Sequence, residues 1–368
     1  MWANRDWVGR SLPVDTPAGR ELDAYARVVN AVEGNTTFYA TPDAATIDRW
    51  RAATPPGFRF IFKLPREITH DRRLRNSTSE LRAFLDRIEP LGDRLGPLMI
   101  QLPASFAPGD LPVLAAFLDT VPASFAWSVE VRHLAFHAGG DAERPLNDLL
   151  HERAVDRVVL DSRPVFDGPC ETPEEIDAWE KKPRVPVRAV ATGEQPIVRF
   201  IGQTDADANP PYWSKWVDTV VRWLDQGRRP IVFLHTPDNL VSLELCRRFH
   251  AEVVDQSDEP NLPPAPPVSI AAQLGDIAST TDPRDALAGG LALLVGVALG
   301  LVVRRLVATV DARVRGAVRL VAAALRPLPG AIAEIVRVDG RSLDEVTMPC
   351  LVFVPAETGR RGPPIRVR

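Results

Sequence analysis

Short apolar runs alternate with amphipathic segments along residues 1–255 of this 368-residue chain. Seven of the runs have the length of a buried strand, and they are apolar at most positions rather than at every second one. Such runs are typical of parallel strands that are covered on both faces. We therefore predict seven parallel strands, at 31–35, 58–63, 98–102, 125–132, 155–160, 197–202 and 230–234.

Between these runs, apolar residues recur at the spacing of helices. The predicted helices are 17–29, 43–53, 79–91, 112–120, 146–153, 212–226 and 240–251, and a proline-rich, charged excursion covers 162–195. This alternation favours an α/β fold, a TIM-like (β/α)8 barrel, over an open doubly wound sheet. Its first strand is truncated to residues 1–3. No GxGxxG or GxxxxGK(S/T) motif follows a strand, which argues against nucleotide binding.

Cysteine usage and charge narrow the class of protein. The three cysteines, Cys170, Cys246 and Cys350, lie far apart, which argues against a disulfide framework and fits a reducing compartment. The chain does not open with a secretory signal, so we expect a cytoplasmic barrel. Residues 281–368 hold 13 basic and 8 acidic residues and therefore have a net charge of +5. Because the whole chain has a net charge of −4, the main body carries −9. An acidic body disfavours nucleic acid as a partner.

Six motifs occur in order: VEGNTTFY at 32–39, TPPGF at 54–58, FKLPREITH at 62–70, LGP at 95–97, QLP at 101–103 and VEVRH at 129–133. On these motifs, residues 2–255 resemble the YecE-like family, a domain of unknown function numbered 72. The resemblance implies a TIM-like barrel and kinship with sugar isomerases and related metal-dependent barrels. It implies no particular reaction, because the family has no established one. The family's glycine-rich first strand is missing ahead of Trp2, and residues after about 263 lie outside the domain.

Polar residues stand at the carboxyl ends of most predicted strands, where a TIM-like barrel carries its chemistry. Burying polar groups costs free energy, so we do not expect most strands of a purely structural barrel to end in them. We predict Glu33 and Glu130 as a general acid/base pair, with His70 and Asp161 as further catalytic residues. The predicted substrate-binding residues are Asn35, Tyr39, Lys63, Arg66, Gln101, Arg132, His133, Arg199 and His235.

Each of these residues also has a purely structural interpretation. Glu33 and Glu130 could pair with Lys63 and Arg132 only to hold the rim of the barrel. The basic residues could neutralise those carboxylates, or they could bind a phosphate or carboxylate group, which we favour. The histidines could be ordinary loop residues, and the aromatic residues could belong to the core.

A metal site is the sharpest alternative. Glu33, Glu130, Asp161 and His235 end four strands, and carboxylate-plus-histidine sets suit Mn²⁺ or Mg²⁺. Against this, the chain has no HxH or HExxH motif, and the neighbouring lysine and arginine residues would repel a cation. A divalent metal is therefore not favoured, and the sequence leaves the cofactor and the oligomeric state open.

The C-terminal third has a different composition. Residues 256–285 are rich in proline, aspartate and serine and are predicted to be a linker. Residues 286–303 carry no charge and reach the lower length of a membrane span. The basic tail 304–368 begins with an amphipathic segment to 326 that could lie on an anionic membrane surface. The alternative for these residues is a buried helical hairpin. If 286–303 does span a membrane, the arginines directly after it favour a cytoplasmic C-terminus. The barrel would then lie on the outer side of the membrane, which conflicts with the expected cytoplasmic location.

Three functions follow from these features. The one we favour is an enzyme, isomerase- or hydrolase-like, that acts by acid/base chemistry on a small sugar-like or phosphorylated substrate. A metal-dependent, nuclease-like barrel is the second. A non-catalytic binding protein that its tail tethers to a membrane is the third.

Overall fold

The computed structural model describes residues 2–137, 139, 141–257 and 349–352, which all belong to one compact unit. All seven predicted strands are present. Wherever two of these seven strands pair with each other, they run parallel. They are β1 (Ala31–Gly34), β2 (Arg59–Phe62), β3 (Leu98–Gln101), β4 (Trp127–Glu130), β5 (Asp156–Asp161), β6 (Ile197–Ile201) and β7 (Ile231–His235). The strand order is β2-β1-β8-β7-β6-β5-β4-β3, where β8 is Pro349–Val352.

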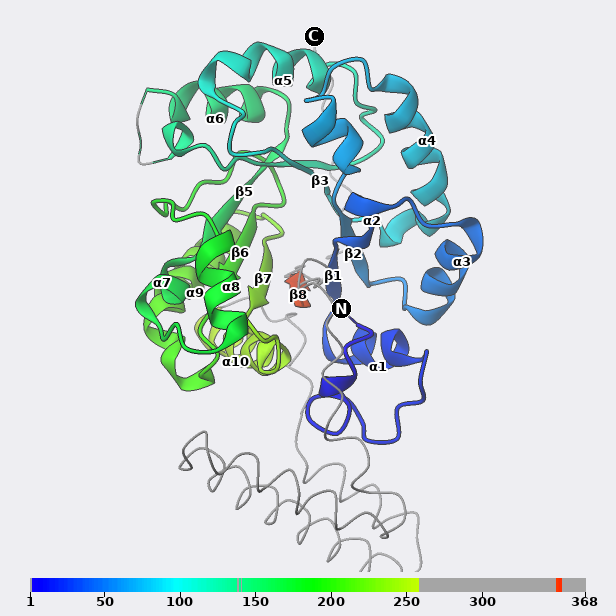
Figure 1. The fold of residues 1–368 in the computed structure, drawn as a ribbon, viewed down its shortest axis with the longest axis vertical. Coiled ribbons are helices and arrows are strands. Elements are labelled where there is room, and N and C mark those ends of the chain that lie inside the picture. The colour runs from blue at the N-terminus through cyan, green and yellow to red at the C-terminus, as the bar shows by residue number, and fades with distance from the viewer. Residues whose placement is uncertain (1, 138, 140, 258–348, 353–368) are drawn as a thin grey trace, which may run out of the picture. The chain divides into compact units, whose positions relative to one another are not determined.

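The predicted helices are also present. They are α1 (Glu21–Val28), α3 (Ala44–Ala53), α4 (Thr78–Ile88), α5 (Leu111–Leu118), α6 (Glu143–Glu152), α9 (Pro210–Asp225) and α10 (Ser242–Gln256). Asp43 caps α3 by accepting a hydrogen bond from the Thr46 N–H, as the sequence suggests. Three short helices were not predicted, namely α2 (Thr36–Tyr39), α7 (Arg163–Asp167) and α8 (Pro173–Lys181). In Figure 1 the strands curve around a common interior and the helices lie outside them.

Two apolar cores lie on the two faces of this curled sheet. Alternate strand residues point to opposite faces, so the strands from β1 to β7, except β4, contribute to both cores. The inner core contains Ala31, Ile61, Met99, Val158, Leu160, Ile197, Ile201, Ile231 and Phe233. The outer core contains Val32, Phe60, Phe62, Leu98, Ile100, Val129, Val159, Val198, Phe200, Val232 and Leu234, together with apolar residues of the helices. Burial on both faces explains why the strands are apolar at most positions.

The prediction of a truncated first strand at residues 1–3 is wrong for the described residues 2 and 3, which form a turn. Trp2 instead packs edge-on against Trp50 of α3 and Phe60 of β2, with ring centroids 5.3 and 6.1 Å apart. In this position the large indole ring buries more apolar surface than it would in a short extended segment. The strand between β1 and β7 is β8, which comes from the predicted tail and runs antiparallel to both.

The end strands β2 and β3 meet without a continuous ladder. The Gly96 N–H donates to the Phe60 carbonyl oxygen at 2.9 Å, and the Leu64 N–H donates to that of Met99 at 3.0 Å. The observed fold is therefore an α/β fold with a curled, mostly parallel sheet. No helix within the described residues is long and apolar enough to cross a membrane. The predicted linker 256–285 beyond residue 257, the span 286–303 and the tail 304–368 apart from β8 lie outside these residues.

Asp156, at the start of β5, is a buried carboxyl group whose protonation should affect stability. Its side chain accepts a 2.8 Å hydrogen bond from the Gln195 N–H. Burial, followed by the charge of Glu194, outweighs that bond and raises the pKa of Asp156 to about 7. An unfolded aspartate has a pKa of about 3.9. Asp156 therefore stabilises the fold below that value, and this contribution is lost as the pH rises to about 7.

We expect Asp156→Asn to raise the melting temperature at pH 8, by about 2–4 °C for each kcal/mol regained, and to have a smaller benefit at pH 5. The amide oxygen of asparagine can still accept from Gln195, so the variant should fold. Thermal unfolding at both pH values checks this. Asp48→Asn, at an exposed position, is the control, and an equal shift at both pH values would show that Asp156 is not protonated in the fold.

Candidate functional site

The inward-facing side of the sheet changes from apolar to polar at the carboxyl ends of the strands. Residues two apart share a face, so each polar residue continues a row that begins in the inner core. The pairs are Ala31 with Glu33, Ile61 with Lys63, Met99 with Gln101, Ile197 with Arg199, and Phe233 with His235. Glu130 joins them because it pairs in register with Gln101.

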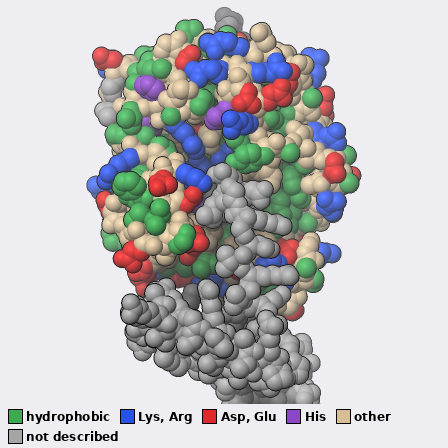
Figure 2. Space-filling view, in the orientation of Figure 1, with side chains coloured by type: hydrophobic (Ala, Val, Ile, Leu, Met, Phe, Trp, Pro, Cys, Tyr) green, Lys and Arg blue, Asp and Glu red, His purple; other side chains and the backbone are tan. Residues whose placement is uncertain are grey.

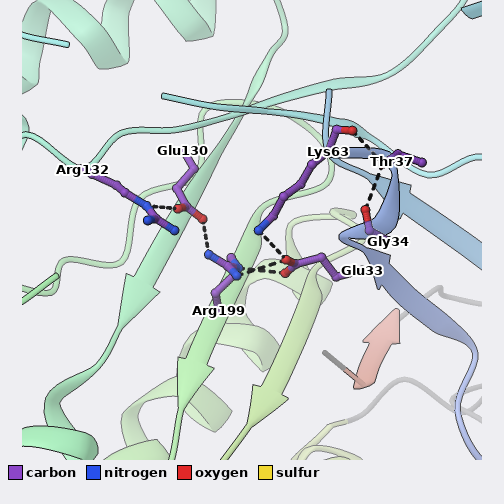
Figure 3. A network of polar contacts seen from close by, with 7 residues as sticks. All are labelled: Glu33, Gly34, Thr37, Lys63, Glu130, Arg132 and Arg199. Carbon is purple, nitrogen blue, oxygen red and sulfur yellow. Dashed lines mark hydrogen bonds and ion pairs between the residues drawn. The ribbon is translucent and has the colours of Figure 1, made fainter. Parts of the chain in front are cut away.

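Arg199 bridges the two buried glutamates at the centre of this layer (Figure 3). Its Nε and Nη2 donate to Glu33 at 2.8 and 3.1 Å, and its Nη1 donates to Glu130 at 2.5 Å. Both glutamates are fully buried and Arg199 is 3% exposed. A buried ionised group is tolerated only when it is paired and hydrogen-bonded, and here the three groups satisfy that condition together.

Lys63 and Arg132 extend the bridge at its two ends. Lys63 Nζ donates to Glu33 at 2.9 Å, and Arg132 Nε donates to Glu130 at 2.9 Å. The Thr37 hydroxyl lies 2.8 Å from the Lys63 carbonyl oxygen and 3.0 Å from that of Gly34, which ties α2 to the ends of β1 and β2. A Cβ atom at Gly34 would lie only 2.3 Å from the Phe62 ring, so this close approach requires glycine.

These contacts set the protonation states. Burial would raise the pKa of each glutamate, but Arg199 and the second basic partner outweigh it and hold both values below the ordinary range. Burial lowers the pKa of Lys63 to about 8, against the opposing charge of Glu33. Glu33 and Glu130 are therefore ionised at neutral pH. Of the five groups in the network, Lys63 has the pKa best suited to proton transfer near neutral pH.

Gln101 and His235 are buried beside the network, at 6% and 5% exposure. Gln101 Oε1 has no hydrogen-bond partner within the described part of the chain. His235 Nδ1 forms no hydrogen bond of ordinary geometry there, although the Asn239 side chain interacts with the ring. Burial, and then the charges of Lys182 and Arg199, place the pKa of His235 well below its ordinary value, so its ring is neutral. Unsatisfied buried polar atoms are uncommon and suggest that something else occupies their surroundings.

His70 lies near the network without contacting it. Its Nδ1 is 2.9 Å from the Thr69 hydroxyl, within the π-helical turn Glu67–Asp71, and its ring meets Phe38 edge-on at 5.0 Å. Burial, then the positive charges of Arg132 and Arg66, lower the pKa of His70 to about 4. His70 is thus neutral at pH 7 and suited to hydrogen bonding rather than to carrying charge.

The structure does not bring the other predicted residues into the network. Asp161 accepts hydrogen bonds from Arg163, at 2.6 and 2.9 Å, and from the Trp216 indole of α9, at 2.8 Å. Arg66 is exposed and pairs with Asp71, and His133 Nδ1 accepts from the Ala135 N–H. Tyr39 is 56% exposed against Phe38, and Asn35 is half-buried before α2.

Lys182, just after α8, is a residue that our sequence analysis missed. Burial, followed by the charges of Arg199, Arg132 and Lys63, lowers the pKa of Lys182 to about 8. Its position could not be read from periodicity, because it lies in the proline-rich excursion after β5 rather than at a strand end. The only signal was that this excursion follows a strand that ends in polar residues.

The four residues of the predicted metal set do not assemble. Glu33 and Glu130 are engaged by cations, and Asp161 is held by Arg163 and Trp216. Across the ranges that the structure describes, no group of three or more His, Cys, Asp or Glu side chains could hold a metal ion. The surface agrees with the basic character of the network, since Lys and Arg side chains line the recess at the centre of the face in Figure 2.

Residues 1–269 match the family model described as "Protein of unknown function DUF72". The chain belongs to the DUF72 family. This confirms the resemblance that the sequence motifs indicate. The chain is also 41% identical, over 267 residues, to the UPF0759 protein YecE of Escherichia coli strain K12, which covers 73% of this chain and 95% of that protein. The same figures hold for YecE of E. coli O157:H7.

Solved structures of DUF72 proteins share the fold. A DUF72 family protein from Enterococcus faecalis V583 matches with a TM-score of 0.53 at 14% identity, covering 69% of this chain and 93% of that one. One from Thermotoga maritima MSB8 matches with a TM-score of 0.51 at 20% identity, covering 67% and 96%. These likenesses support the α/β fold with its curled sheet, and their names state no activity.

Proposed function

We propose that this DUF72 protein is an enzyme that transfers a proton on a small anionic substrate, sugar-like or phosphorylated, at the carboxyl ends of β1, β2, β4 and β6. The observation that carries the proposal is the buried network of Glu33, Glu130, Lys63, Arg132 and Arg199. It places three cations against two carboxylates, so it has an excess positive charge. We infer in addition that the curled sheet is a variant of the TIM-like (β/α)8 barrel, whose sites lie at these strand ends.

Lys63 is the group we assign to proton transfer. A side chain with a pKa of about 8 exists in both forms near neutral pH, which is what a general acid/base requires. The neutral amine would take a proton from a carbon next to a substrate carbonyl and return it to a neighbouring atom. Glu33 holds Lys63 in place at 2.9 Å.

Solvent exchange tests this proposal without knowledge of the product. The full chain is incubated in D2O with a panel of sugar phosphates and hydroxy acids, and NMR follows the replacement of carbon-bound hydrogen by deuterium. We expect exchange on at least one anionic, carbonyl-bearing compound. Binding of such compounds with neither exchange nor product formation would instead identify a binding protein.

A further inference from the structure

Lys182 stands at the carboxyl ends of β5 and β6. Its N–H donates to the Ala178 carbonyl oxygen at the end of α8, and the carbonyl oxygen of the next residue, Pro183, accepts from the Ser162 hydroxyl at 2.7 Å. Ala178 and Val185, on either side of Lys182, belong to the inner core with Leu160 and Ile201. The segment is therefore packed against the inner side of the sheet, just beyond Arg199 in β6.

The Lys182 ammonium group has no ion-pair partner among the residues that the structure describes. The terminal Nη atoms of Arg132 are likewise uncommitted within those residues, because only its Nε bonds to Glu130. Lys63 and Arg199, in contrast, are occupied by Glu33 and Glu130. Among the described residues, Lys182 and Arg132 are thus the two cations of the site whose terminal nitrogens form no ion pair with either glutamate.

The charge of the site favours a dianionic ligand while Lys63 is protonated. In that state Lys63, Arg132, Lys182 and Arg199 carry four positive charges, and Glu33 and Glu130 carry two negative ones. A dianion neutralises the remainder, whereas a carboxylate leaves one cation unpaired. Guanidinium groups bind phosphate through two parallel hydrogen bonds, and lysine adds a point charge.

The polar atoms of Gln101 and His235 describe the rest of the ligand. Gln101 Oε1 is an acceptor without a donor, and Gln101 lies in register with Glu130, which holds Arg132. His235 Nδ1 accepts from or donates to a hydroxyl group, depending on its tautomer. Hydroxyl groups satisfy both positions.

We propose that the ligand is a phosphorylated polyhydroxy compound whose phosphate dianion binds between Lys182 and Arg132 and whose hydroxyl groups reach Gln101 and His235. This inference deepens the proposed function and rests on the same site. It adds three residues, Lys182, Gln101 and His235, to the network, and the roles of Lys182 and Gln101 can be measured separately.

Calorimetry on the full chain tests the phosphate position, with glycerol 1-phosphate, inorganic phosphate, lactate and glycerol as probes. We expect the two phosphates to bind, with lactate and glycerol much weaker. Lys182→Met should weaken the binding of glycerol 1-phosphate by about 10- to 100-fold, the usual loss for one charge-assisted hydrogen bond. Lys181→Met is the matched control, because Lys181 is the neighbouring residue and pairs with Asp177, and it should leave the Kd unchanged.

Gln101→Leu tests the hydroxyl position. It removes the unsatisfied buried oxygen, so the variant should fold, and it should bind inorganic phosphate like the wild type. We expect the wild type to bind glycerol 1-phosphate more tightly than inorganic phosphate, and Gln101→Leu to bind the two with similar Kd values.

Three results would overturn the inference: no binding of either phosphate to the wild type, equal Kd values for the Lys182 and Lys181 variants, or lactate binding as tightly as the phosphates. Its failure is distinguishable from that of the proposed function. Deuterium exchange on a non-phosphorylated compound with no phosphate binding would overturn the ligand class alone. Phosphate binding without exchange on any compound would overturn the enzymatic role alone.

Discussion

Replacing Arg199 by methionine is expected to lower the free energy of unfolding by about 3–5 kcal/mol, the usual cost of removing one partner from a buried ion pair. Arg199 is the only group in the network that bonds to both Glu33 and Glu130. Without it, Glu33 keeps only Lys63 and Glu130 keeps only Arg132, and both carboxylates stay buried. Urea unfolding at pH 7 measures the loss.

Two further variants make this result specific. Arg66→Met removes an exposed arginine that pairs with Asp71 and should cost less than about 1 kcal/mol. The quadruple variant Glu33→Gln, Lys63→Met, Glu130→Gln, Arg199→Met removes the four buried charges together and should recover much of the lost stability, because neutral replacements of a whole buried network are often tolerated. A loss below 1 kcal/mol for Arg199→Met alone would show that the network is not buried as described.

Lys63→Met is expected to slow deuterium exchange on the substrate by about 10²- to 10⁴-fold, the usual contribution of a general acid/base. The fold should survive, since methionine has a similar shape and Glu33 retains both bonds to Arg199. Lys215→Met, at an exposed position on α9, serves as the control and should leave the rate unchanged.

The pH profile provides a second readout on Lys63. A general base acts in its neutral form, so the wild-type rate should rise about tenfold per pH unit below the pKa of about 8 and level off above it. The residual rate of Lys63→Met should lack this step. A wild-type rate that is flat from pH 6 to pH 9 would contradict the assignment of Lys63 as the base.

The positions of the strands and helices followed from local chemistry. The signals that define these elements, namely apolar runs, the Asp43 cap and prolines at element ends, each involve only a few consecutive residues. The sequence alone therefore located β1 to β7 and the polar residues at their ends. The DUF72 motifs gave the family for the same reason, because each is a short contiguous stretch.

The assembly of the site depended on which face each side chain takes. Strands buried on both faces show little inside–outside alternation, so the sequence could not indicate that Asp161 follows an inner residue, Leu160, and turns towards Trp216 instead. It could not indicate either that β8 would lie between β1 and β7, since that pairing joins distant segments.

The sequence by itself therefore determined β1 to β7, the seven longer helices and the supply of charged groups at the strand ends. Only the tertiary structure decided the partners. Arg199 bonds to Glu33 across 166 residues and to Glu130 across 69, and Lys182 comes from an excursion after β5. The physical reason is that a buried charge is stable only beside its counter-charge. Which charged side chains become neighbours depends on how the sheet curls.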